Sequence, residues 1–343
     1  MRELLFDLCA LDAVAGREEP IRAYITEKVR PFAEPVETDR LGNLIVRVKG
    51  SRAPEKGAVV LAAPMDEAGF VLTEWGDCGC VKLSQMDQMD SKVVVGKRFR
   101  IANEPDRKAV ISLVSQHLAG DTGTVPEFRD MQMDFGAISE ERVKELVKLG
   151  ETAVYDYPLK PFGDGYLRGK ALECRIGCAV LLKTIMTVKP KYDTIFLFLA
   201  AKFIDHRGAA PAARALDPHI ALVVDYAAAG DLPLGLPETR NSFLGKGPAL
   251  GIKEFGSIYS RPLREQIRAM ADAHGIPWQY RTGMYGMSDA GMLHTSGSGA
   301  AVASIAVPAR YPLSPLPVMS ETDIDNACRL TACFVTEVDE DAV

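Results

Sequence analysis

The chain of 343 residues has no long apolar run and no excess of basic residues. A membrane-spanning helix needs about 20 consecutive apolar residues, so we expect no membrane partner. The 46 acidic and 40 basic residues are mixed along the chain and give a formal charge of -6. Such a chain has no basic stripe that would hold a phosphate backbone, and we expect no nucleic-acid partner.

Cysteine is also sparse. The seven cysteines are odd in number and contain no Cys-x-x-Cys pair, which favours reduced thiols over a disulfide framework. Residues 1–7 carry acids within their apolar stretch and have no small-residue cleavage site, unlike a secretory leader. These features predict a cytoplasmic protein.

Two patterns of apolar and polar residues alternate along the chain. Continuous apolar runs such as Val59–Ala63 stand between segments of helical periodicity, which predicts a mostly parallel sheet covered by helices on both faces. Residues 70–162 instead show short alternating stretches divided by Gly, Pro and Asp, a pattern typical of a small β-barrel. We therefore predict a discontinuous α/β domain of residues 1–69 and 163–343, interrupted by a β-barrel domain.

Polar residues gather where the predicted parallel strands end, which is where ligands bind in such sheets. One further polar cluster, Leu172 to Arg175, precedes a helix predicted over Arg175–Thr187. The segments at the strand ends are Pro64-Met65-Asp66-Glu67, Lys202 to His206, Asp225-Tyr226 and Arg310 to Pro315.

Several segments resemble the metallo-aminopeptidases named glutamyl aminopeptidases or, under an older label, endoglucanases. The resemblance runs from the opening helix pair to the last strand. It implies a zinc-peptidase-like three-layer core with an inserted small β-barrel, and an oligomer, because the better-known members form tetrahedral dodecamers. The segments are Asp39-Arg40-Leu41-Gly42-Asn43-Leu44, Met65 to Phe70, Arg207-Gly208-Ala209, Leu244 to Pro248, Ser288-Asp289-Ala290 and Val307 to Tyr311.

The resemblance also implies a dinuclear metal site. The family uses two zinc or cobalt ions, held by two His and three carboxylates, with a Glu as general base on the bridging water. At the five ligand positions this chain carries Pro64, Glu173, Phe203, Asp225 and Leu313. Three of these side chains have no metal-binding atom, one is a carboxylate longer by a methylene, and one is unchanged.

The position of the general base is occupied by Lys202. A charged ammonium cannot take a proton from metal-bound water. We expect Lys202 to form an ion pair with Glu173 or Asp225, because buried carboxylates without a cation cost several kcal/mol. No catalytic residue and no cofactor is therefore expected, and if an ion is bound, Glu173 and Asp225 are its candidate ligands.

The other residues of this degenerate site leave alternatives open. In the family, the aspartate matching Asp66 orients the ligand His; here a turn or capping role is the alternative. Cys174, followed by Arg175, is either an activated thiol or a plain buried one. His206 is the nearest of the five His residues, and we interpret it as a solvated or backbone-bonded loop residue. Glu67 follows Asp66 in the polar segment at the end of the predicted strand Val59–Ala63. Ser288, Asp289, Arg310 and Tyr311 are either pocket residues or scaffold turns.

Two functions follow from this pattern. The first is a catalytically inactive aminopeptidase homologue that acts as an oligomer partner or a peptide-binding protein. Its assembly would be a homo-oligomer or a mixed oligomer with active relatives. The alternative is an active metal-dependent aminopeptidase or hydrolase with a rearranged metal site.

Overall fold

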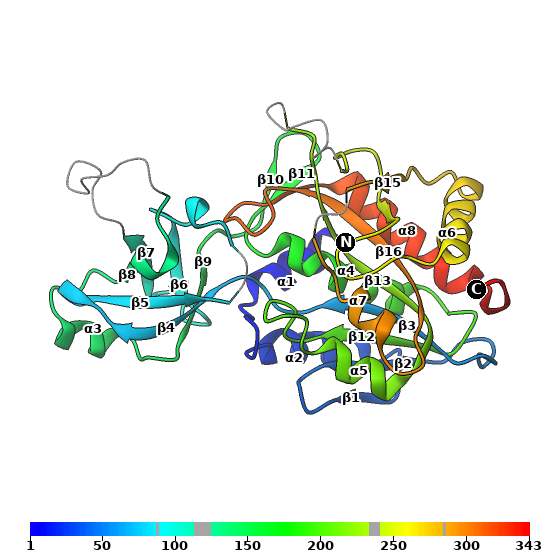
Figure 1. Cartoon of the computed structure of the whole chain (residues 1–343), viewed down its shortest axis with the longest axis horizontal. Coiled ribbons are helices and arrows are strands. Elements are labelled where there is room, and N and C mark those ends of the chain that lie inside the picture. The colour runs from blue at the N-terminus through cyan, green and yellow to red at the C-terminus, as the bar shows by residue number, and fades with distance from the viewer. Residues whose placement is uncertain (87–88, 113–124, 233–240, 284–285) are drawn as a thin grey trace.

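The computed structural model describes residues 1–343 except 87–88, 113–124, 233–240 and 284–285. Figure 1 shows a large α/β body with a smaller β-barrel beside it, and the two lie along the longest axis of the molecule. The predicted fold class is confirmed: a mixed α/β core with a mostly parallel sheet, accompanied by a closed antiparallel barrel.

The large sheet is built around parallel strands that come from distant parts of the chain. Strands β12, β3, β13 and β16 are neighbours and pair in parallel. The strands on either side of this group in the main order pair antiparallel. The order across the sheet is β1 (Val36–Thr38), β2 (Leu44–Val48), β12 (Thr194–Leu199), β3 (Ala58–Pro64), β13 (Pro218–Ala228), β16 (Ala301–Arg310), β17 (Val318–Ser320), β11 (Tyr166–Arg168) and β10 (Lys160–Phe162), with β14 (Ala249–Gly251) and β15 (Gln279–Arg281) to one side.

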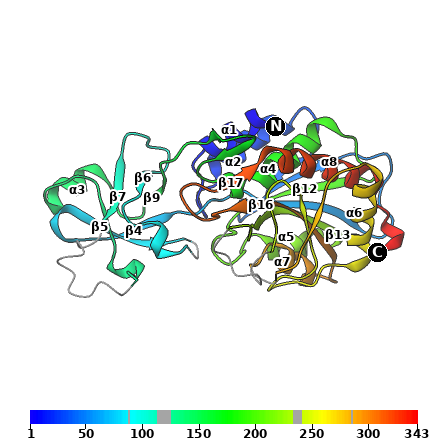
Figure 2. The same ribbon diagram turned by 90° about the horizontal axis from the view of Figure 1, so that it is seen from above.

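Helices cover both faces of this sheet. Figure 2 shows α4 and α8 on one face and α5 and α7 on the other. The continuous apolar run of β3 has a physical reason, because Leu61 packs in the core under α4 while Val60 packs in the core under α5 and α7. The helices of the α/β body are α1 (Arg2–Ala10), α2 (Glu19–Val29), α4 (Leu172–Thr187), α5 (Ala209–Leu216), α6 (Arg261–Ala273), α7 (Ala290–Thr295) and α8 (Glu321–Glu337).

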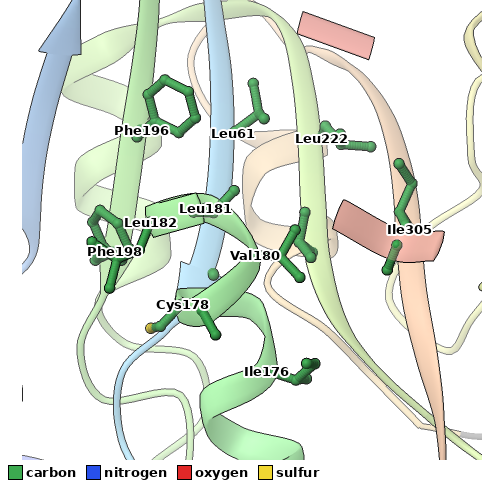
Figure 3. Close-up of a cluster of buried hydrophobic side chains, with 14 of the residues drawn as sticks. Leu61, Ile176, Cys178, Val180, Leu181, Leu182, Phe196, Phe198, Leu222 and Ile305 are labelled. Atoms are coloured by element: carbon green, nitrogen blue, oxygen red, sulfur yellow. The ribbon is translucent and has the colours of Figure 1, made fainter. Parts of the chain in front are cut away.

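Helix α4 lies close against the centre of the sheet. Figure 3 shows Val180, Leu181 and Leu182 of this helix in one buried cluster with strand residues such as Leu61 and Leu222. Gly177 makes the approach tight, because a β-carbon there would lie 2.2 Å from the carbonyl oxygen of Val224. The helix begins at Leu172, earlier than the predicted start at Arg175. The polar cluster Leu172 to Arg175 therefore lies on the first turn of α4 rather than on a loop before it.

The barrel has its own core. Its strands close in the order β4 (Phe70–Trp75), β5 (Cys80–Gln85), β8 (Gln132–Asp134), β7 (Lys108–Ser112), β6 (Arg98–Ile101) and β9 (Thr152–Tyr155), and α3 (Glu140–Leu146) packs beside them. Phe70 and Phe99 meet edge to face inside it, with ring centroids 5.4 Å apart. The division of the chain at 69/70 and 162/163 stays a prediction. Strand β10 falls within the predicted insert, yet it pairs with β11 of the large sheet.

A buried ion network joins the barrel to the α/β body, and we call it the junction network. Arg100 of β6 donates to both oxygens of Asp12, at 2.6 and 2.7 Å. Lys170 lies 2.9 Å from Asp12 and 2.9 Å from Glu67, which also accepts from Arg175 at 2.9 Å. The sequence analysis assigned Glu67 to the predicted metal site. In the structure, Glu67 is an ion-pair partner in the junction network.

No helix among the described residues is long and apolar enough to cross a membrane.

Candidate functional site

The candidate site lies where β3, β12 and β13 end. Leu199 of β12 is in register with Pro64 of β3, so the residues that follow both strands leave the sheet at the same edge. Asp225 lies near the end of β13, the next strand along. Parallel pairing therefore brings together Asp66, Lys202 and Asp225, which are far apart in the sequence.

A buried ion pair occupies the centre of this edge. The Lys202 ammonium lies 2.9 and 2.7 Å from the two carboxylate oxygens of Asp225, and each residue is 5% exposed. The rings of Tyr226 and Phe203 lie 4.8 and 5.4 Å from the same nitrogen. Burial alone would lower the pKa of Lys202, but the charge and hydrogen bond of Asp225, together with Tyr226 and Asp289, raise the pKa above its ordinary value. Lys202 is therefore a cation at neutral pH, paired with one of its two expected partners.

Asp66 fixes the loop that carries Lys202. Its two oxygens accept the backbone N–H groups of Lys202 and Phe203, at 3.1 and 2.9 Å. The side chain is fully buried, and burial raises the pKa of Asp66 to about 7. The loop needs this support, because Ala201 before it has a left-handed φ of 58°.

Glu173 and Leu313 are hydrogen-bonded to each other. Glu173 lies on the first turn of α4 and accepts the backbone N–H of Leu313 at 2.9 Å. Tyr311 and Leu313 both have left-handed φ angles, 54° and 59°. Glu173 thus holds a strained loop, and the Leu313 side chain packs against the barrel core instead of offering a ligand atom.

Pro64 and Cys174, two further residues of the predicted site, lie on β3 and α4. Pro64 ends β3, and its carbonyl oxygen accepts the Cys178 thiol at 3.0 Å. Cys174 is buried on α4, and burial raises the pKa of its thiol well above the ordinary value. A thiol with a raised pKa is a weak nucleophile, which favours the plain buried thiol of the two alternatives.

His206 differs from the prediction. It is buried, at 7% exposure, and its Nδ1 lies 2.8 Å from an oxygen of the fully buried Asp289. Burial lowers the pKa of His206, but the hydrogen bond and charge of Asp289 outweigh it and raise the pKa overall. The interpretation as a solvated or backbone-bonded loop residue was wrong. Sequence reasoning missed this His-Asp pair because the two residues lie 83 positions apart.

The side chains present do not fit a five-ligand, two-ion arrangement. Pro64, Phe203 and Leu313 offer no donor atom, and Lys202 contacts both oxygens of Asp225. Glu173 and Asp225, the candidate ligands from the sequence, are both buried. An ion next to Asp225 would have to displace the Lys202 ammonium or lie beside its charge.

Comparison with known proteins gives the family. Residues 42–330 match the family model of the M42 glutamyl aminopeptidases. The chain belongs to the M42 peptidase family. A protein of Acetivibrio thermocellus whose name places it among the aminopeptidases is 32% identical over 337 residues, covering 96% of this chain and 97% of its own length.

Solved M42-like structures superpose on nearly the whole chain. An aminopeptidase of the archaeon Desulfurococcus kamchatkensis has a TM-score of 0.92 at 28% identity, covering 99% of this chain and 95% of its own. A TET aminopeptidase of a marine sediment Thaumarchaeota archaeon has a TM-score of 0.93 at 28% identity, covering 98% and 96%. The resemblance found in the sequence is confirmed.

Membership in this family corrects one prediction. M42 aminopeptidases are metal-dependent, so the expectation that this chain takes no cofactor was wrong. The expectation rested on the three ligand positions that carry apolar side chains. Loss of ligands at these positions does not exclude an ion held by the remaining carboxylates, because hard divalent cations bind carboxylate oxygens.

The four predicted pocket residues of this M42 chain fall into separate places. Asp289 joins the site through His206, whereas the hydroxyl of Ser288 donates to the buried Glu254 at 2.8 Å and lies in another polar cluster. Arg310 makes two 2.8 Å contacts to Asp231. Arg310 and the half-exposed Tyr311 line a cavity of about 560 Å³. The other residues of its wall are Lys92, Val93, Lys97, Tyr157, Phe162, Arg168, Ser314, Pro315, Leu316 and Val318.

Proposed function

We propose that this chain is a non-hydrolytic member of the M42 family that binds peptides or completes an oligomer. The Lys202–Asp225 ion pair is the observation that carries the proposal. Peptide hydrolysis needs a group that takes a proton from the attacking water. At the position that the family resemblance gives to this base, the side chain is an ammonium, which has no free electron pair.

The surroundings of Lys202 keep it from becoming a base. A lysine acts as a base only after it loses its proton, and the charge of Asp225 raises its pKa instead. A divalent ion bound by Glu173 or Asp225 would not change this, since it would place more positive charge nearby without supplying a proton acceptor. The proposal therefore concerns water activation and does not depend on the metal content.

Peptide binding is supported by the cavity lined by Arg310 and Tyr311. It lies between the barrel and the large sheet, and the same loop carries Leu313 to the site. Aromatic walls from Tyr157 and Phe162, with Lys92 and Lys97 at the barrel side, suit a short peptide that carries a carboxylate.

We also infer that the chain forms homo-oligomers. The TET1 peptidase of Pyrococcus horikoshii, 25% identical with a TM-score of 0.86, assembles into a tetrahedron or a large octahedral shell. In this chain the segment after β14 exposes Ile252, Phe255 and Ile258 at 40%, 85% and 67%. Large exposed apolar side chains grouped in one segment are typical of an interaction surface. Mixed assembly with active relatives is a second form of the same proposal.

With seven cysteines that are all thiols, we place the protein in the cytoplasm.

This assembly is tested at the exposed segment. Changing Phe255 to Asp puts a charge into the apolar surface and is expected to lower the mass measured by analytical ultracentrifugation to that of a smaller assembly. Phe162→Asp, at a half-exposed phenylalanine elsewhere, is the matched control and is expected to leave the mass unchanged. A monomeric wild-type protein would rule out the homo-oligomer.

One observation favours a second function, an active hydrolase with rearranged chemistry. The imidazole of His206 is held by Asp289 through Nδ1, the arrangement by which a carboxylate orients a catalytic base. Its pKa is raised by the same aspartate, after the opposing effect of burial. In this reading, His206 would replace the missing glutamate as the proton acceptor.

Hydrolysis assays separate the two functions. Protein purified without chelators is incubated with a panel of aminoacyl anilides in added Zn²⁺, Co²⁺ or Mn²⁺. The proposal expects no turnover above that of the Lys202→Met variant. Turnover that is lost in His206→Ala but kept in His219→Ala, at a histidine whose ring contacts the carbonyl oxygen of Glu340, would support the second function. Any metal-dependent turnover would overturn the first.

A further inference from the structure

We propose a second metal site, for zinc or a similar borderline divalent ion, formed by His274, Cys333 and Glu337. These residues lie outside the strand-end site. His274 directly follows α6, and the other two are on the last turns of α8. Among the described residues, they are brought close enough for each to offer one ligand atom to a common ion.

The helices place the three side chains together. Cys333 and Glu337 are four residues apart and so lie on the same face of α8. Figures 1 and 2 show α6 and α8 beside each other near the C-terminus. Arg329, one turn before Cys333, donates to the carbonyl oxygen of His274 at 3.2 Å and so anchors the end of α6 to α8.

Small side-chain movements would bring the three ligand atoms to the distances of a tetrahedral ion. The Nε2 of His274 lies 2.6 Å from Oε1 of Glu337, and the three ligand atoms all lie within 4.8 Å of one another. Zinc ligands at their usual bond lengths stand roughly 3.3–3.8 Å apart. The side chains would need to move by about an ångström, and His274 and Glu337 are exposed while Cys333 is partly so, which leaves them free to adjust.

The ligand types indicate which ion. Imidazole and thiolate favour zinc and its neighbours over magnesium and calcium, which prefer oxygen ligands alone. Three protein ligands leave the fourth position to water, as in an open zinc site. Since the ligands come from the ends of two helices, a bound ion would clamp α6 to α8 and stabilise the folded chain.

Cobalt titration tests this site directly. Metal-stripped full-length protein is titrated with Co²⁺, and a thiolate-to-cobalt charge-transfer band is expected at one equivalent. The band should disappear in Cys333→Ser and in Cys333→Ala. It should persist in Cys328→Ser, the matched control, because Cys328 is on the same helix but outside the cluster. The band identifies this site independently of any ion held by the strand-end carboxylates.

Affinity measurements complete the test. In competition with a chromophoric chelator, His274→Gln and Glu337→Gln should each weaken zinc binding by at least about tenfold. Circular dichroism checks that every variant is folded. A missing band in wild type, a band that survives loss of Cys333, or binding only at millimolar zinc would overturn the proposal.

Discussion

The two buried groups of charges, the junction network and the strand-end site, are built on opposite balances. In the junction network two carboxylates, Asp12 and Glu67, meet three cations. At the strand ends, by contrast, one ammonium, Lys202, serves a group of acids that includes Asp66, Glu173, Asp225 and Asp289. The two groups therefore differ in the sign of the charge in excess, which is positive in the junction network and negative at the strand ends.

The loops of the strand-end site also contain several residues with left-handed backbone angles. Around the strand-end site Ala201, Asp205, His206, Tyr311 and Leu313 all have left-handed φ angles, between 53° and 67°. Non-glycine residues rarely adopt this region, and such strain is concentrated at functional sites. This M42 chain thus has strained loops around its strand-end site.

The largest effect is expected from breaking the junction network. Changing Glu67 to Gln leaves Arg175 buried without its carboxylate and leaves Lys170 with Asp12 alone. The free energy of unfolding in urea should fall by about 3–5 kcal/mol. Glu145→Gln, which breaks an exposed pair with Arg142, is the control and should cost less than about 1 kcal/mol. Equal small losses in both variants would remove the contrast between this network and surface pairs.

A double-mutant cycle sharpens the comparison at Lys202. Lys202→Met leaves the Asp225 carboxylate buried without its cation, and we expect a loss of about 3 kcal/mol at neutral pH. The loss should shrink as the pH falls, because protonation of Asp225 removes the uncompensated charge. In Lys202→Met with Asp225→Asn, much of the stability should return, as measured by urea unfolding of the four proteins. Additive losses would mean that the two side chains do not interact.

The excess of acids makes a prediction about pH. Burial raises the pKa of Asp66 from 3.8 to about 7, and Glu18 and Asp289 add to the effect. Between these values the folded chain holds a proton that the unfolded chain has released, so wild-type stability falls as the pH rises through this window. Asp66→Asn removes the titration.

This difference is measured as wild-type minus variant free energy of unfolding. It should decrease by at most about 1.4 kcal/mol per pH unit between pH 4 and 7, and level off above. The same change at the exposed Asp106 controls for the loss of one charge. A flat difference across the window would show that Asp66 is ionised throughout.

The smallest expected effect concerns backbone strain. Ala201→Gly relieves a left-handed φ of 58° and should raise the free energy of unfolding by about 0.5–1 kcal/mol. Ala200→Gly, at the neighbouring position, which is not among the strained ones, should lower it by about the same amount. If both changes destabilise the protein, the loop of the site is not strained.

Much of the fold could be predicted from the sequence, because it depends on local pattern. The run Val59–Ala63 is apolar throughout since both faces of β3 are buried, and the alternating texture of residues 70–162 follows from a barrel with one face in its core. The start of α4 was missed, since Ala171 enters the helix from a left-handed φ without a capping side chain.

For the site, the sequence by itself determined which chemistry each position offers: no donor atom at Pro64, Phe203 and Leu313, and an ammonium at Lys202. These are properties of the side chains and need no coordinates. Only the tertiary structure decided the partners, giving Lys202 to Asp225, Glu67 to the junction network and His206 to Asp289. Such pairs join residues that lie far apart in the chain, and their contacts depend on strand order and loop path rather than on local sequence.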